Sequence, residues 1–290
     1  MLKKKYMAFF EKYKHIAVEY YSYLKPVALM IKEHYDTPEY DGTIFMINTF
    51  WAVLDSQYID EFYKYKRRIY YNLEHKCTDD LAYNQYKEFD MQFVDKILNE
   101  AGCTEFWTMD YNPEITYLIR EISDIPIKYK PVRYTTLIPQ VKNIYTAKKT
   151  IDFCHIGGLS SSHRMDLIRK FEALGCQISF KFITQTGDIK SCITNMNDSR
   201  FMLDTLRIDT IATPNQVRIF ELLCMGYTVC TEKCGLNMFP GLVYEWETPE
   251  DLIEIANRNE YLHPTEAYKE MTYTDEAYGQ YVNNLIKLQS

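Results

Sequence analysis

The chain has 290 residues, a net charge of −7, and hydrophobic and charged fractions of 47% and 25%. These fractions are typical of a soluble globular protein, and no apolar run approaches the roughly 20 residues that a membrane-spanning helix needs. An acidic chain is also a poor general partner for nucleic acid, which binds clustered Lys and Arg, so nucleic acid is not an expected ligand.

Residues 1–36 carry apolar and aromatic side chains at mixed three- and four-residue spacing, which predicts a helix. The start of this segment is basic but lacks the sustained apolar core and cleavage site of a secretion signal. We therefore expect a cytoplasmic protein. Packing of this segment on a sheet is the first expectation, and peripheral contact with the inner face of a membrane is the alternative.

The next part of the chain alternates between strand-like and helix-like patterns. Such alternation favours βαβ units and a parallel sheet. The predicted strands lie at residues 43–47, 68–74 and 105–109 and within 127–138, and the predicted helices at 54–66 and 84–101.

A polar stretch without periodicity, residues 139–150, reads as a linker, and a second α/β series follows it. Its predicted strands lie at 151–156, 177–183, 201–206, 227–231 and 241–245, and its helices at 161–174, 187–195, 215–225 and 248–258. The predicted class is α/β, with two Rossmann-like domains that face a cleft. We expect a compact N-terminal domain over 1–145, a C-terminal domain over 146–262, and a helical tail over 263–290 that packs back on the N-terminal domain.

The eight cysteines form no C-x-x-C pair. Cys230 and Cys234 are four residues apart, but no second Cys or His pair accompanies them as a zinc site would require. We expect no structural metal and a reducing compartment.

The first candidate motif follows the strand at 151–156 and reads Gly-Gly-Leu-Ser-Ser-Ser-His-Arg over residues 157–164. Gly157 and Gly158 let the backbone approach a ligand. Ser160, Ser161 and Ser162 are candidate caps for the next helix, and the N-terminus of that helix favours an anion. Arg164 is placed to pair with a diphosphate. The alternative is a tight turn with a good cap. The motif is not the G-x-G-x-x-G dinucleotide fingerprint.

The second candidate motif opens the predicted helix at 215–225. Asn215 suits a helix start, and Gly226 is a normal helix stop. Arg218 and Glu221 stand three residues apart, where they can pair with each other. In the functional interpretation, Glu221 instead accepts hydrogen bonds from two ribose hydroxyls, and Arg218 either supports the loop or meets phosphate. The end of the next predicted strand and the loop after it contain three residues that can face the same site: Thr231, Glu232 and Gly235.

In this order, the two motifs resemble the C-terminal domain of GT-B glycosyltransferases of the family-4-like, group-1 type, over about residues 150–260. The family pattern R-x-F-E-A-L-A-C-G-x-x-V-V-x-E is similar to the run from Arg218 to Glu232. The resemblance implies that Glu221 binds the ribose of a nucleoside-diphosphate sugar. It also implies that the loop at 157–160, with Arg164, lies near the diphosphate. Many family members carry an acidic residue eight positions before the ribose-binding one, where this chain has Thr213.

The resemblance implies a hexosyltransferase-type enzyme that moves a sugar from a nucleoside-diphosphate sugar to a carbohydrate or glycolipid, as in polysaccharide biosynthesis. The chain has no D-x-D string, which favours a metal-independent enzyme without a cofactor. Three alternatives stay open. They are a glycosyltransferase acting on modified DNA bases, a non-catalytic GT-B-like module that binds a nucleotide or a protein, and an unrelated Rossmann-type enzyme.

Candidates for the catalytic groups come from both halves of the chain. His75 ends one predicted strand and is a candidate general base, oriented by Glu74 or by Asp110 at the end of another. Arg164 is the first candidate for stabilising the departing diphosphate. His155 lies inside a predicted strand, where a packing role is expected.

Overall fold

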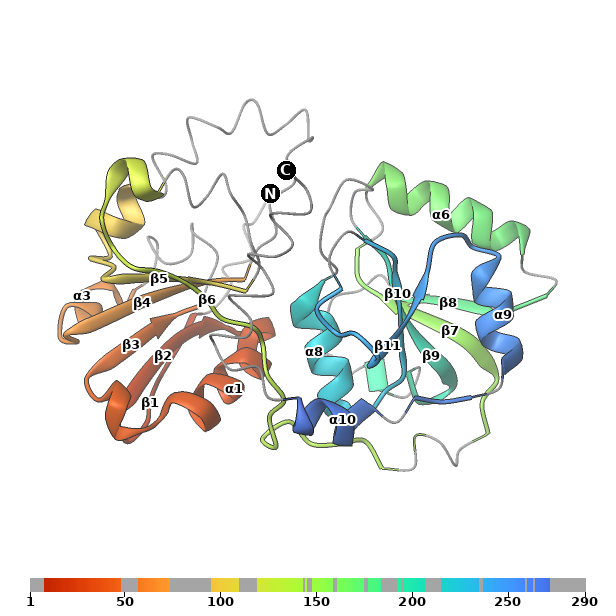
Figure 1. The fold of residues 1–290 in the computed structure, drawn as a ribbon, viewed down its shortest axis with the longest axis horizontal. Helices are drawn as coiled ribbons and strands as arrows, with labels where there is room; N and C mark the ends of the chain where they lie inside the picture. Colours follow the sequence, from red (N-terminus) through yellow and green to blue (C-terminus); the bar gives the residue numbers. More distant parts are fainter. Residues whose placement is uncertain are drawn as a thin grey trace. The chain divides into compact units, whose positions relative to one another are not determined.

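The computed structural model describes residues 8–47, 57–73, 95–109, 119–142, 144, 148–158, 161–174, 177–183, 192–193, 196–206, 215–234, 237–258, 260–262 and 264–271. The chain divides into two compact units, and the division falls between Leu137 and Ile138. Each unit contains one sheet with helices packed on it (Figure 1).

The first unit contains a 6-stranded sheet in the order β1-β2-β3-β4-β5-β6. The first two strands pair antiparallel, and every other neighbouring pair is parallel. The strands are β1 (Ala8–Lys12), β2 (Ile16–Tyr21), β3 (Thr43–Met46), β4 (Arg67–Asn72), β5 (Glu105–Thr108) and β6 (Ile127–Tyr129).

The prediction of one helix over residues 1–36 is wrong for residues 8–21, which form the β1–β2 hairpin. The aromatic and β-branched residues of β2 fit a strand that is buried on both faces, where a continuous apolar run gives no period to read. The chain becomes helical only after a short 3-10 turn, η1 (Ser22–Leu24), in α1 (Lys25–Tyr35), which has a proline in its first turn.

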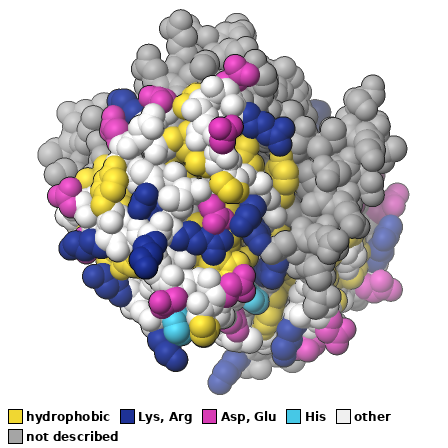
Figure 2. All heavy atoms as spheres, turned by 60° about the vertical axis from the view of Figure 1, so that its left-hand side comes forward, with side chains coloured by type: hydrophobic (Ala, Val, Ile, Leu, Met, Phe, Trp, Pro, Cys, Tyr) yellow, Lys and Arg dark blue, Asp and Glu magenta, His cyan; other side chains and the backbone are white. Residues whose placement is uncertain are grey.

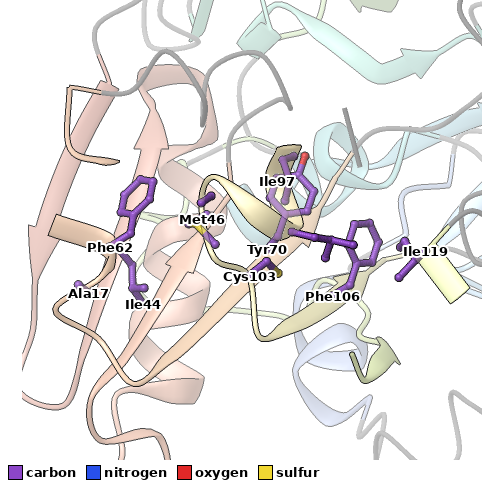
Figure 3. Close-up of a cluster of buried hydrophobic side chains, with 11 residues drawn as sticks. Ala17, Ile44, Met46, Phe62, Tyr70, Ile97, Cys103, Phe106 and Ile119 are labelled. Carbon is purple, nitrogen blue, oxygen red and sulfur yellow. The ribbon is translucent and has the colours of Figure 1, made fainter. Parts of the chain in front are cut away.

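The two faces of the first sheet are both covered. On one face, Tyr35 of α1 packs its ring against Phe45 and Trp107, with ring centroids 5.5 and 5.2 Å apart. The other face carries a separate apolar cluster that includes Phe62 of α3 (Ile59–Phe62) (Figure 3). Its strand residues are Ala17, Ile44, Met46, Tyr70 and Phe106.

The strands predicted in the first half are confirmed as β3 to β6. The helix predicted at 54–66 is confirmed only as the short α3. Residues 48–56 and 74–94 lie outside the described residues, and they include the first three residues of the helix predicted at 54–66 and most of the helix predicted at 84–101. Asp36 is the C-cap of α1, and Thr37 then begins a second 3-10 turn, η2 (Pro38–Tyr40).

The second unit contains a 5-stranded parallel sheet in the order β11-β10-β9-β7-β8. Its strands are β7 (Ile151–Ile156), β8 (Phe180–Ile183), β9 (Ser199–Asp204), β10 (Val229–Glu232) and β11 (Val243–Trp246). Its helices are α6 (Ser162–Ala173), α8 (Gln216–Met225), α9 (Asp251–Arg258) and α10 (Pro264–Glu270). All five strands and the helices at 161–174, 215–225 and 248–258 were predicted from the sequence. The helix predicted at 187–195 lies largely outside the described residues.

Helices pack on both faces of the second sheet (Figure 1). The side chains of α6 and α9 that reach the sheet join Phe153, Phe201 and Trp246 in one apolar cluster. On the opposite face, α8 contacts β9 and β10 through its apolar stripe. Gly226 ends α8 in the left-handed conformation, with φ of 94°, as its place in the sequence predicted.

The chain joins the second unit before residue 145, where the sequence suggested a boundary. The Val141 N–H donates to the Met225 carbonyl at 3.0 Å, so the segment after Leu137 already packs on the end of α8. Residues 264–270 of the expected tail form α10, which packs on α8 within the same unit. The rest of the tail lies outside the described residues, and its packing stays a prediction.

Charges of both signs share the face that Figure 2 shows. Lys and Arg side chains there lie interspersed with Asp and Glu. Mixed charge of this kind differs from the clustered positive charge that nucleic acid binds. Among the helices that the structure describes, none is long and apolar enough to cross a bilayer.

Candidate functional site

The order in which strands are added to the second sheet reverses at β7. The chain places β8 on one side of β7 and the next strand, β9, on the other side. In open parallel sheets, ligands bind at the carboxyl ends of the two strands that flank such a switch point. Here those strands are β7, which ends at Ile156, and β9, which ends at Asp204. The described strands of the first sheet follow one another in sequence order and contain no such reversal.

Arg164 ties the two strand ends together. Its guanidinium donates to the Gly158 carbonyl at 2.7 Å, the Thr205 carbonyl at 2.8 Å and the Leu206 carbonyl at 3.0 Å. Gly158 follows β7, and the other two residues follow β9. The residue is held at the start of α6 by the cap, in which the Ser161 hydroxyl accepts from the Arg164 N–H. Its rigid fork therefore fixes the shape of the switch point.

Arg218 comes from the first turn of α8, on the other side of the site. The Asn215 side chain caps that helix by accepting from the Arg218 N–H at 3.1 Å. The Arg218 guanidinium donates to Asp204 at 2.9 Å, and the Asp204 side chain has no solvent exposure. Among the ion pairs of the described residues, Arg218 is therefore paired with Asp204 and not with Glu221.

Gly157 is required where Arg218 crosses the end of β7. Its φ is +144°, and a Cβ placed on it would lie 2.8 Å from Arg218 Nη2 and 3.4 Å from His155 Nε2. A side chain at this position would push against the paired guanidinium. The next glycine, Gly158, has open space where a Cβ would stand.

His155 presents a buried acceptor beside Arg218. Its Nδ1 lies 3.0 Å from the Leu203 carbonyl, and its Nε2 is buried without a hydrogen-bond partner. Burial, together with the charges of Arg218 and Arg164, lowers the pKa of His155 to about 3. The ring is therefore neutral at physiological pH, with the proton on Nδ1 facing the carbonyl. This leaves Nε2 as an unprotonated acceptor that is buried beside Arg218.

Glu232 extends the polar network to the end of β10. One of its oxygens accepts from the Leu206 N–H at 2.8 Å, and the other lies 2.7 Å from His163 Nε2 of α6. Burial raises the pKa of Glu232 above its ordinary value. Beside it, the Thr231 hydroxyl donates to Asp204 at 3.3 Å. Residues 204–206 at the end of β9 are thus held by side chains of β10.

Among the described residues of the second unit, four have buried polar atoms without a hydrogen-bond partner, and all four lie at the carboxyl edge of the sheet. They are His155 in β7, Thr205 after β9, Gln216 at the start of α8 and Trp246 at the end of β11. An unsatisfied buried polar atom costs free energy, and native proteins contain few. Three of the four, His155, Thr205 and Gln216, lie on the chain segments that border the switch point.

The structure brings together five of the residues that the sequence singled out: Gly157, Gly158, Arg164, Asn215 and Arg218. Glu221 lies one turn after Arg218 on α8 and is half-buried. Ser160, His75 and Asp110 lie outside the described residues. In the part of the chain that the structure describes, no group of three or more His, Cys, Asp or Glu is placed to hold a metal ion.

The sequence reading missed the roles of Asp204 and Gln216 and assigned His155 to packing. Asp204 had no local signal, because its partner is 14 residues away and meets it only through the sheet. Gln216 did carry a signal: a glutamine in register with Ile219, Phe220 and Leu223 on an apolar helix face breaks the hydrophobic pattern.

No family model and no curated protein sequence matches this chain. Among solved structures, it is similar to the crystal structure of the pneumococcal O-GlcNAc transferase GtfA in complex with UDP and GlcNAc. The TM-score is 0.41 and the identity 11%, over 85% of this chain. The match spans 57% of the length of that protein's chain. A likeness this distant assigns no activity to this chain.

Proposed function

We propose that this chain is a glycosyltransferase of GT-B architecture that uses a nucleoside-diphosphate sugar as donor. The observation that carries the proposal is the switch point of the second sheet. Unpartnered buried atoms of His155, Thr205 and Gln216 lie there with Arg218 and the starts of α6 and α8. Helix N-termini and arginine are the groups that bind phosphate without a metal.

In this proposal, Arg218 is the cation that faces the diphosphate. Asp204 holds its guanidinium at the end of β7, in the space that Gly157 leaves by having no side chain. When the bond between the sugar carbon and the diphosphate oxygen breaks, negative charge grows on the leaving group. A preorganised cation and two helix N-termini stabilise that charge without reorganising. The proposed enzyme therefore needs no metal ion.

Arg164 has a different role in this proposal from the one its sequence position suggested. Three of its N–H groups already donate to backbone carbonyls of the two strand ends. We assign it to positioning the loops that carry the site. Its positive charge also adds to the potential that a diphosphate meets.

We assign the contact with the ribose to the C-terminal half of the chain and the contact with the acceptor to the N-terminal half. Glu221 is proposed to accept hydrogen bonds from the ribose hydroxyls. His75, oriented by Asp110, is proposed as the general base toward a carbohydrate or glycolipid hydroxyl. The described strands that precede these two residues, β4 and β5, are neighbours and parallel, so both chain segments leave the same edge of the first sheet.

The test is release of nucleoside diphosphate from UDP-, GDP-, ADP- and CDP-sugars by the purified protein in EDTA, with water or an added sugar as acceptor. We expect turnover with one nucleotide family, and loss of at least a hundredfold in Arg218→Met. Arg169→Met, which changes an exposed arginine of α6, is the matched control and should turn over like wild type. Tight binding of a nucleotide sugar without any turnover would instead favour the non-catalytic module.

A further inference from the structure

Gln216 is the first residue of α8, and its side chain is fully buried. Neither its amide oxygen nor its amide nitrogen has a hydrogen-bond partner. The Asn215 side chain next to it is already engaged by the Arg218 N–H. Gln216 is thus a complete donor and acceptor pair held in a buried position.

The surroundings of Gln216 on the helix are apolar. Residues three, four and seven positions later on the same face are Ile219, Phe220 and Leu223, each with no exposure. A methionine has a similar length and helix propensity and would occupy this position without an unsatisfied amide. The free protein is therefore less stable with glutamine here than with an apolar side chain of the same size.

The first turn of α8, which contains Gln216, lies beside the switch point. Two residues after Gln216, Arg218 reaches Asp204 at the end of β9. A crossover helix runs against the strands it connects, so its first turn lies at the carboxyl edge of the sheet. Gln216 is therefore within one helical turn of the group that we assign to the diphosphate.

We propose that Gln216 is a specificity residue whose amide exchanges two hydrogen bonds with an adjacent donor and acceptor on the ligand. This inference rests on the proposed donor site, because it needs the diphosphate on Arg218 to place the rest of the ligand. Two parts of a nucleotide sugar carry the required chemistry: neighbouring hydroxyls of the sugar ring and the edge of the base. A site with such a buried pair rejects ligands that cannot complete it.

The experiment uses Gln216→Met and measures two quantities on the full chain: the melting temperature of the free protein and the Kd for nucleotide sugars by calorimetry. We expect the melting temperature to stay equal or rise and the Kd to increase tenfold or more. Gln177→Met, at an exposed glutamine of the same unit, is the control and should change neither quantity. Gln216→Glu should also weaken binding, because it removes the donor and adds a negative charge near the phosphates.

The arms of the experiment separate the two sources of the contact and the two ways it can fail. An equal loss of affinity for the sugar nucleotide and for the free nucleoside diphosphate assigns the contact to the base. A loss confined to the sugar nucleotide assigns it to the sugar. A lower melting temperature in Gln216→Met with unchanged Kd would overturn the specificity role and make the amide a structural group. If wild type binds no nucleotide sugar, both this inference and the proposed function fail.

Discussion

The Arg218 guanidinium donates to the Asp204 carboxylate at 2.9 Å, and the Asp204 side chain is fully buried. Arg218 lies in the first turn of α8 and Asp204 ends β9, so a single ion pair fixes the start of the helix to the carboxyl edge of the sheet. Gly157 makes the arrangement possible by leaving space for the guanidinium at the end of β7. The proposed diphosphate site is therefore organised before any ligand arrives.

Removing one partner of this pair should destabilise the second unit. Arg218→Met leaves the buried Asp204 charge uncompensated, and we expect a loss of about 3 kcal/mol in the free energy of unfolding. The double variant Arg218→Met, Asp204→Asn should be less destabilised than the sum of the two single variants. Urea unfolding followed by circular dichroism measures these differences.

The exposed pair of Arg169 and Asp166 on α6 gives a control for these stability measurements, since its side chains are 73% and 63% exposed. Arg169→Met should change stability by less than about 1 kcal/mol. A similar small effect for Arg218→Met would contradict the view that its pair with Asp204 organises the site.

The two adjacent glycines should respond differently to substitution. Gly157→Ala places a Cβ 2.8 Å from Arg218 Nη2 at a φ of +144°, so we expect a loss of about 2 kcal/mol of stability and weaker ligand binding. Gly158→Ala adds a methyl group to open space and should cost much less. Equal effects at the two positions, in melting temperature and in Kd, would show that Arg218 does not occupy the space beside Gly157.

A charge-conserving change at Arg164 separates its two possible roles. Lysine keeps the positive charge but cannot reach three carbonyls with one forked group. If Arg164 positions the loops, Arg164→Lys should lose stability and donor binding almost as fully as Arg164→Ala. Retention of wild-type affinity in Arg164→Lys, measured by calorimetry, would instead mean that the charge itself contacts the diphosphate.

His155 should make stability depend on pH. Its pKa is about 3 in the folded protein and about 6.5 when unfolded, so the unfolded state binds more protons between these values. Stability therefore falls as pH drops below about 6.5, with a slope of at most ~1.4 kcal/mol per pH unit from this group. His155→Asn keeps a donor for the Leu203 carbonyl but does not titrate.

The measurement is the difference in unfolding free energy between His155→Asn and wild type, from urea titrations between pH 4.5 and 8. We expect the difference to be constant above about pH 7 and to move in favour of the variant as the solution becomes more acidic. Glu232 has a raised pKa and so contributes a slope of opposite sign, which cancels because both proteins contain it. A difference that does not change with pH would mean that the pKa of His155 is the same in the folded and unfolded states.

Most of the second unit was predictable from the sequence because its elements have local signals. Asn215 caps the start of α8 and Gly226 ends it, and the five strands correspond to short apolar runs between turns. The first unit was harder. Its opening hairpin contains a doubly buried strand, β2, whose run of apolar and aromatic residues reads equally well as a helix until its pairing with β1 and β3 is known.

The site was predictable in its glycines, arginines and caps, and less so in its pairings. The i, i+3 spacing of Arg218 and Glu221 suggested a pair within one helix, but the sheet supplies Asp204 as a buried partner. Burial favours the pair of Arg218 with Asp204. A buried carboxylate that is not hydrated needs a counter-charge more than the partly exposed carboxylate of Glu221 does. The three carbonyls that Arg164 binds likewise come together only through the order of the strands in the sheet. The spacing of residues along the sequence does not reveal that order.

The central claim is that the switch point of the second sheet binds a nucleoside-diphosphate sugar without a metal. The most direct measurement is a thermal-shift screen of the purified protein against UDP-, GDP-, ADP- and CDP-sugars in EDTA. A ligand at a hundred times its Kd stabilises the folded state by ~2.7 kcal/mol. We predict a rise in melting temperature with one nucleotide family that is lost in both Glu221→Ala and Arg218→Met. No rise with any of the four, or a rise that both variants retain in full, would contradict the claim.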